Sequence, residues 1–128
     1  MGPGTHGSTF GGNPVVCAGA NVVVDRMDQS FLANVNARAV QLRAGLAKLP
    51  HVKSISGIGL MVGIEFYDLN AADVLAACRE AGLLVLTAKT RLRLLPPLTL
   101  SEHDTEMALE ILGRVLSGME PVAPKEQV

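Results

Sequence analysis

The hydrophobic period of the chain changes at Pro50, and this change limits the folds that are open to it. Before Pro50, apolar residues recur every three or four positions, which is typical of one face of a helix. The members of this series are Leu32, Val35, Ala39, Leu42, Leu46 and Leu49. After Pro50, short apolar runs separated by glycine and proline favour strands. Helices followed by a mixed segment favour an α+β domain that is preceded by a helical arm.

The segment after Pro50 predicts the element order β-β-α-β-β-α. The expected strands are residues 52–56, 60–66, 83–87 and 91–95. Asn70 is expected to cap a helix over residues 71–81 that stops at Gly82. Ser101 begins a last helix, and the side chains expected on its inner face are Met107, Ala108, Ile111, Leu112 and Val115. A small antiparallel or mixed sheet with helices on one side would satisfy this order.

The first fifty residues predict a loop and two helices. Asn13-Pro14 is a typical helix start, because Asn caps free amides and Pro fits the first helical position. The following helix is apolar nearly all round from Val15 to Met27, so we expect it to form an interface and to drive self-association. The resulting division is a glycine-rich loop at 1–13, a helical arm at 14–50, an α+β domain at 51–119 and a frayed tail at 120–128.

Composition excludes several classes of protein. The 128 residues are 48% hydrophobic and 18% charged, with a formal net charge of −1, which is typical of a globular domain. No basic patch indicates a nucleic-acid or membrane partner, and the apolar run Val15–Val24 is too short to cross a bilayer. Cys17 and Cys78 have no metal or redox spacing, so we expect both to be buried thiols of a cytoplasmic protein. No carboxylate cluster indicates a metal site.

The loop His6-Gly7-Ser8-Thr9-Phe10-Gly11-Gly12-Asn13-Pro14 carries the most chemistry. Two adjacent hydroxyls, Ser8 and Thr9, lie among glycines and ahead of a helix N-terminus. Hydroxyls, freed backbone amides and a helix dipole are what a phosphate group needs. A linker whose hydroxyls only satisfy a turn has the same composition, so the residues alone leave both interpretations open.

Arg91 and Arg93 form the second candidate site. On a strand they share one face, and Leu92 and Leu94 occupy the other. A guanidinium held on a strand can bind a carboxylate through two parallel hydrogen bonds, although two solvated arginines would give the same pattern. Glu65 is expected either to pair with a neighbouring arginine or to face solvent. His51 and His103 are expected at the surface.

Four blocks of this sequence resemble the acetylornithine-type members of the class III, fold-type I aminotransferases. They are His6–Pro14, Gly59–Glu65, Ala81–Val85 and Leu92–Leu98, in the order and spacing of that family. The resemblance extends to about Met119 and implies the small C-terminal domain of such an enzyme. It further implies a homodimer that transfers an amino group from N-acetylornithine to 2-oxoglutarate through pyridoxal phosphate, in arginine biosynthesis.

The resemblance also implies roles for individual residues. Thr9 would bind the cofactor phosphate of the other subunit, Ser8 would lie beside the substrate, and Arg93 would bind a substrate carboxylate. Arg91 has no comparable role.

The family's Schiff-base lysine, which lies upstream of the His-Gly-Ser-Thr block, has no counterpart in this sequence. The lysines present are Lys48, Lys53, Lys89 and Lys125, and each is expected to be a surface charge. We therefore expect a C-terminal fragment that is inactive alone and does not retain the cofactor. The alternative is a free-standing α+β module that binds an amino acid through Arg93 or has a regulatory role. In that case the Ser8-Thr9 loop has no function.

Overall fold

The structure is a computed structural model that describes residue 2 and residues 4–121. The contacts divide the chain into two compact units, Met1–Ala33 and Asn34–Val128. Each unit is described by itself below. The expected tail at 120–128 lies outside the described residues from position 122 onward.

The first unit holds the loop, helix α1 (Pro14–Asp25) and the first turn of helix α2 (Gln29–Leu46). Asn13 caps α1 and Pro14 takes its first position, as the sequence predicts. Within the described residues, no side chain of α1 is buried. Cys17 is therefore exposed, and the prediction that it is a buried thiol is wrong. Its neighbours on α1 are valines and alanines, but no second layer of this unit covers them.

Helix α2 buries the stripe that its three-and-four spacing predicts. The buried members are Val35, Ala39, Leu42 and Leu46. Leu32, which belongs to the first unit, remains 41% exposed. The helix ends at Leu46, three residues before Leu49, the last member of the predicted series. A turn follows, in which the Lys48 amide donates to the Gly45 carbonyl.

The second unit contains a four-stranded antiparallel sheet in the order β1-β2-β4-β3. The strands are β1 (Val52–Ile58), β2 (Met61–Phe66), β3 (Leu86–Ala88) and β4 (Arg91–Leu94). All pairings are antiparallel, which decides between the two sheet types that the sequence left open. Strand β3 begins three residues later than expected, and residues 83–85 approach the helices instead.

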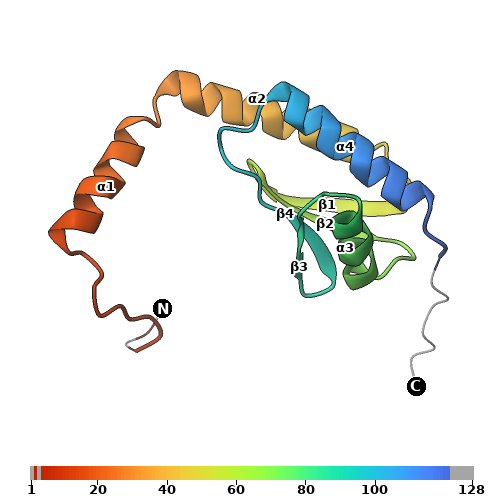
Figure 1. Ribbon diagram of the computed structural model, residues 1–128, viewed down its shortest axis with the longest axis horizontal. Coiled ribbons are helices and arrows are strands. Elements are labelled where there is room, and N and C mark those ends of the chain that lie inside the picture. The colour runs from red at the N-terminus through yellow and green to blue at the C-terminus, as the bar shows by residue number, and fades with distance from the viewer. Residues whose placement is uncertain (1, 3, 122–128) are drawn as a thin grey trace. The chain divides into compact units, whose positions relative to one another are not determined.

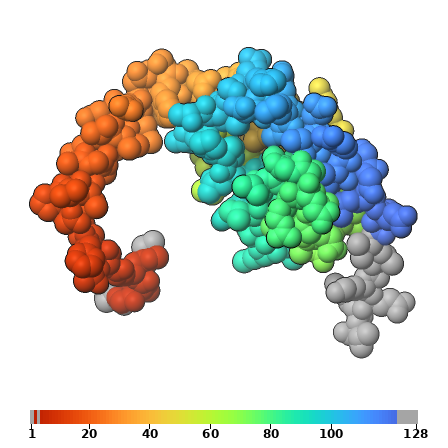
Figure 2. Space-filling model, in the orientation of Figure 1, coloured from red at the N-terminus to blue at the C-terminus, as the bar shows by residue number. Residues whose placement is uncertain are grey.

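One face of this sheet is the core of the unit. Val62, Ile64 and Phe66 of β2 alternate with exposed or half-buried neighbours, and Leu92 of β4 is fully buried beside Ile64. Helix α3 (Ala71–Glu80) contacts β3, β4 and helix α4 (Glu102–Ser117). Helix α2 runs beside α4 (Figure 1). The space-filling view shows α3, the β3–β4 segment and α4 packed against one another in green to blue (Figure 2).

A glycine brings α2 and α4 close together. A Cβ added at Gly45 of α2 would overlap the side chain of Leu109 on α4, and one at Gly113 would lie 3.2 Å from Leu49. Leu109 of α4 therefore packs against the glycine position of α2, and Leu49, in the turn after α2, packs against the glycine position of α4. This contact ties the end of α2 to the last helix of the chain.

The inner face of α4 differs from its prediction. Thr105, Leu112 and Leu116 are buried, whereas Met107 is 44% exposed. The buried stripe thus begins at Thr105, two residues before Met107, the first residue of the predicted face. The Thr105 hydroxyl donates to the Ser101 carbonyl at 2.7 Å, so the side chain can be buried without an unpaired polar group. Ser101 caps α4 and Asn70 caps α3, both as predicted.

Candidate functional site

The loop before α1 presents two free hydroxyls. Ser8 and Thr9 are exposed, and neither side chain donates or accepts a hydrogen bond within residues 4–121. Gly12 adopts a positive φ of 77°, and a Cβ added at Gly11 would lie 3.0 Å from Ser8 Oγ. The chain thus folds back so that Gly11 lies beside the Ser8 side chain, while Ser8 and Thr9 both remain exposed.

The first amides of α1 are already occupied. Asn13 Oδ1 accepts from the amides of Val15 and Val16, both at 3.1 Å. We expected the helix N-terminus to help hold a phosphate, but its side-chain cap has taken two of the donors that a phosphate would use. The donors that remain are the hydroxyls of Ser8 and Thr9 and the amides of the loop.

The second candidate site lies on the open face of the sheet. Arg91 and Arg93 point to this face, opposite the buried Leu92, as the alternation predicts. Arg93 pairs with Gly63 on β2 and with Leu86 on β3. Ser8 and Thr9 belong to the first unit, whereas both arginines belong to the second.

Arg91 is held by two partners within the sheet. Its guanidinium donates to Ser56 Oγ at 2.8 Å and to Glu65 Oε2 at 3.1 Å. It reaches Ser56 on the edge strand β1 by crossing β2 at Gly63, where a Cβ would lie 3.7 Å from Arg91 Cδ. Of the two alternatives for Glu65, pairing with an arginine is therefore confirmed. Arg91 ties three strands together.

Glu65 holds several partners at once. Lys53 Nζ donates to its Oε1 at 2.7 Å, and Ser54 Oγ donates to its Oε2 at 3.1 Å. A bulge between Val52 and Ser54 puts Lys53 within reach of this face. The hydrogen bond from Lys53, followed by the one from Ser54, holds the pKa of Glu65 below its ordinary value. Glu65 therefore stays ionised and occupied near neutral pH.

Arg93 is different from Arg91. Its side chain forms no ion pair and no hydrogen bond among the described residues, and its Nε atom is buried without a partner. A planar guanidinium with free donors is suited to binding a carboxylate through two parallel hydrogen bonds. The structure thus separates two arginines that the sequence pattern treats alike.

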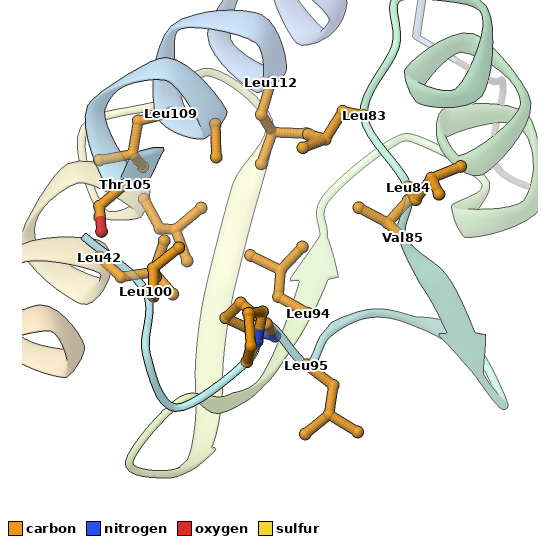
Figure 3. Close-up of a pocket in the computed structure, with 14 residues that line it drawn as sticks. Leu42, Leu83, Leu84, Val85, Leu94, Leu95, Leu100, Thr105, Leu109 and Leu112 are labelled. Atoms are coloured by element: carbon orange, nitrogen blue, oxygen red, sulfur yellow. The ribbon is translucent and has the colours of Figure 1, made fainter. Parts of the chain in front are cut away.

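An apolar pocket of about 260 Å³ lies elsewhere in the second unit (Figure 3). It is bounded by α2, by α4 and by residues 83–85 and 94–100. Leu42 and Leu112 form part of its wall, and Thr105 supplies a hydroxyl that the Ser101 carbonyl already accepts. No titratable side chain lines this pocket, so it offers no group for acid–base or nucleophilic chemistry.

The sequence did not reveal a histidine–aspartate contact. His51 Nδ1 lies 2.7 Å from Asp68 Oδ1, and the His51 carbonyl accepts from the Tyr67 amide. His51 has a positive φ of 64°, and its side chain is 18% exposed, so the residue expected at the surface is half-buried. These contacts join the start of β1 to the end of β2, and the pair has no nucleophile beside it in the described contacts. In the sequence, only Pro50 directly before His51 could have indicated a turn at this point.

Among residues 2 and 4–121, no group of three metal-ligating side chains comes together. No helix there is long and apolar enough to span a membrane.

Comparison with known proteins decides the family. The family model described as Aminotransferase class-III matches residues 1–116. This chain belongs to the class III aminotransferases. It is 51% identical over 117 residues to the acetylornithine aminotransferase of Haemophilus ducreyi, covering 91% of this chain and 30% of that protein. This chain therefore spans about 30% of the length of the curated relatives that it matches.

Solved structures of this family have the same fold. The acetylornithine aminotransferase of Elizabethkingia anophelis superposes with a TM-score of 0.76 at 28% identity, covering 93% of this chain and 34% of that one. An ornithine aminotransferase of Toxoplasma gondii gives a TM-score of 0.71 at 29% identity, covering 91% and 30%. The expected α+β class and the resemblance to class III aminotransferases are confirmed. Proteins of this class use pyridoxal phosphate.

Three of the four lysines lie at ordinary surface positions in this class III chain. Lys48 is exposed after α2, Lys53 pairs with Glu65, and Lys89 is exposed in the turn between β3 and β4. Lys125 lies outside the described residues.

Proposed function

We propose that this chain is the C-terminal portion of a pyridoxal-phosphate-dependent acetylornithine aminotransferase. The whole enzyme would transfer the amino group of N-acetylornithine to 2-oxoglutarate, as a cytoplasmic homodimer in arginine biosynthesis. The observation that carries the proposal is Arg93, an unpaired guanidinium within the Arg93-Leu94-Leu95-Pro96-Pro97 block. Its neighbour Arg91 is already bound by Glu65 and Ser56, so fewer of its donors are available to a ligand.

Residues of both units fit the tasks of such an enzyme. Pyridoxal phosphate, when bound, supplies the electron sink for amino-group transfer. The free hydroxyl of Thr9 is suited to donate to the phosphate of a neighbouring subunit, and Ser8 to lie beside the substrate. Arg93 is suited to bind a substrate carboxylate. The capped amides of α1 leave the hydroxyls and loop amides as the phosphate donors.

The organisation follows from these tasks. Residues 1–13 would form a cofactor and interface loop, residues 14–50 an arm, and residues 51–119 the small domain. Helix α1 buries none of its described side chains, and an uncovered apolar helix favours association with a second copy. Light scattering should therefore give a mass of at least two chains for the purified protein.

The chain alone should be inactive. Lys48, Lys53 and Lys89 lie at the surface positions described above, and none stands in an enclosed site. We expect no glutamate from the purified 128-residue chain with pyridoxal phosphate, N-acetylornithine and 2-oxoglutarate. Turnover by this chain would overturn the assignment of the cofactor lysine to another segment.

A chimaera tests the function directly. The matching 117 residues of the Haemophilus ducreyi enzyme are replaced with those of this chain, and glutamate formation is measured with N-acetylornithine and with ornithine as donors. Activity with N-acetylornithine supports the proposal. Arg93→Gln in the chimaera should raise the KM for 2-oxoglutarate by about 10- to 100-fold, because a charged hydrogen bond is lost. A folded chimaera with cofactor bound but no activity toward either donor would contradict it.

A further inference from the structure

The open face of the sheet raises a question about Arg93. Glu65 stands on β2 two residues from Gly63, the residue that pairs with Arg93. Side chains at such diagonal positions lie within reach when they are long. An unpaired guanidinium and a carboxylate at this spacing should attract each other, yet no contact between Arg93 and Glu65 exists in the structure.

The contacts of Glu65 explain why the two remain apart. Both of its oxygens are occupied, Oε1 by Lys53 at 2.7 Å and Oε2 by Ser54 and Arg91 at 3.1 Å each. Arg91 is itself fixed from the far side by Ser56 on β1. Lys53 and Ser54 hold the carboxylate from β1, and Arg91 holds Oε2 from β4, so both oxygens are engaged before Arg93 can reach them.

We propose that Lys53 and Arg91 are positioning residues that sequester the Glu65 carboxylate, so that Arg93 stays free to bind the carboxylate of a ligand. The inference rests on the proposed function, in which Arg93 binds a substrate carboxylate. Without the two cations, Glu65 swings toward Arg93 and competes with the ligand for the same guanidinium. Lys53 and Arg91 touch no substrate in this account and act through Glu65 alone.

The test uses the full 128-residue chain and two measurements. The first is the NMR resonance of the Arg93 Nε–Hε group without ligand, which moves when a carboxylate binds the guanidinium. The second is a titration with glutarate, a simple dicarboxylate. In the variant with Lys53→Gln and Arg91→Gln, the Arg93 resonance should shift toward its carboxylate-bound position. Glutarate affinity should fall about two- to fivefold, because the ligand then competes with one cross-strand charge pair.

Adding Glu65→Gln to that double variant is the decisive step. The Arg93 resonance and the glutarate affinity should then return to the values of the unchanged chain. If Lys53 and Arg91 only stabilised the sheet, Glu65→Gln would restore neither the Arg93 resonance nor the glutarate affinity. The matched control is Lys48→Gln with Arg114→Gln, which likewise removes two positive charges, one from the exposed turn after α2 and one from an exposed position of α4, and should change neither measurement.

Each other outcome is decisive as well. An unmoved Arg93 resonance in the double variant overturns the proposal, and so does a lost affinity that Glu65→Gln fails to restore. If the double variant loses its native spectrum, the single variant Arg91→Gln is measured instead. Its Arg93 resonance should shift less but in the same direction, and adding Glu65→Gln should abolish this shift. If the unchanged chain and Arg93→Gln bind glutarate equally, the proposed role of Arg93 fails, while the ligand-free resonance still decides whether Glu65 is sequestered.

Discussion

The guanidinium of Arg91 lies 2.8 Å from the hydroxyl of Ser56, although their strands, β4 and β1, are separated by β2. The side chain crosses the intervening strand at Gly63, where a Cβ would stand 3.1 Å from Ser56 Oγ and 3.7 Å from Arg91 Cδ. The absence of a side chain at Gly63 thus allows one arginine to connect three strands. This crossing also leaves Arg93, the next residue on the same face, with no protein partner in the described chain.

Gly63→Val should break this crossing. The valine side chain would occupy the path of Arg91 and separate it from Ser56, so we expect a loss of about 1 to 3 kcal/mol in the free energy of unfolding. Urea denaturation measures the loss. Gly7→Val is the control, because nothing lies within 4 Å of a Cβ at Gly7. Equal stability of the Gly63 variant and the unchanged chain would contradict the crossing.

Gly45→Ile should loosen the contact between α2 and α4. The new side chain would overlap Leu109, and overpacking of this kind costs about 1 to 3 kcal/mol despite the better helix propensity of isoleucine. Leu109→Ala in the same chain should recover part of the loss by removing the overlapping group. Thermal unfolding of the single and double variants measures both effects. If the double variant loses more stability than the two single variants lose together, the strain does not arise at this contact.

Stability should fall at acid pH through Glu65. Its pKa is held below the ordinary value of 4.5, first by the Lys53 hydrogen bond and then by Ser54. The unfolded chain therefore binds a proton more readily, and the contribution of Glu65 is present above pH 4.5 and lost as pH falls through the lower folded pKa. Urea midpoints between pH 3 and 6 should depend less on pH in Glu65→Gln.

Asp28 is expected to contribute to the same loss of stability at acid pH. The amide of Phe31 and the hydroxyl of Ser30 also lower the pKa of Asp28, in the same direction. Asp28→Asn therefore serves as the comparison, and the two variants should remove separate parts of the pH dependence. An unchanged slope in Glu65→Gln would mean that its partners do not hold it in solution.

The two cysteines should react at very different rates. Cys17 is exposed on α1, whereas Cys78 on α3 is fully buried, and burial raises the pKa of the Cys78 thiol. A thiol reagent should modify one group quickly in the native chain and the second only after unfolding, since the thiolate is the reactive form. Cys17→Ser should abolish the fast phase and Cys78→Ser should keep it. Rapid reaction of both thiols in the native chain would contradict the burial of α3.

Local patterns in the sequence were sufficient for the elements and for the candidate residues. The spacing of Val35, Ala39, Leu42 and Leu46 predicts the buried stripe of α2, and alternation places Arg91 and Arg93 on one strand face. Helix caps at Asn13, Asn70 and Ser101 are equally local, because a cap is formed by a side chain and the amides two or three residues later. The four family blocks depend only on residue order, so the resemblance also needed no structure.

The tertiary structure alone decided what each of these residues contacts. Thr105 is buried and Cys17 is exposed, against their residue types, because burial depends on which layer lies opposite. Arg91 and Arg93 are equivalent in the strand pattern, but register sets Arg91 against Glu65 and Ser56 and leaves Arg93 unpaired. Sequence periodicity reports the face on which a side chain stands. The partner on that face comes from another strand, and its identity follows only from the pairing of the strands.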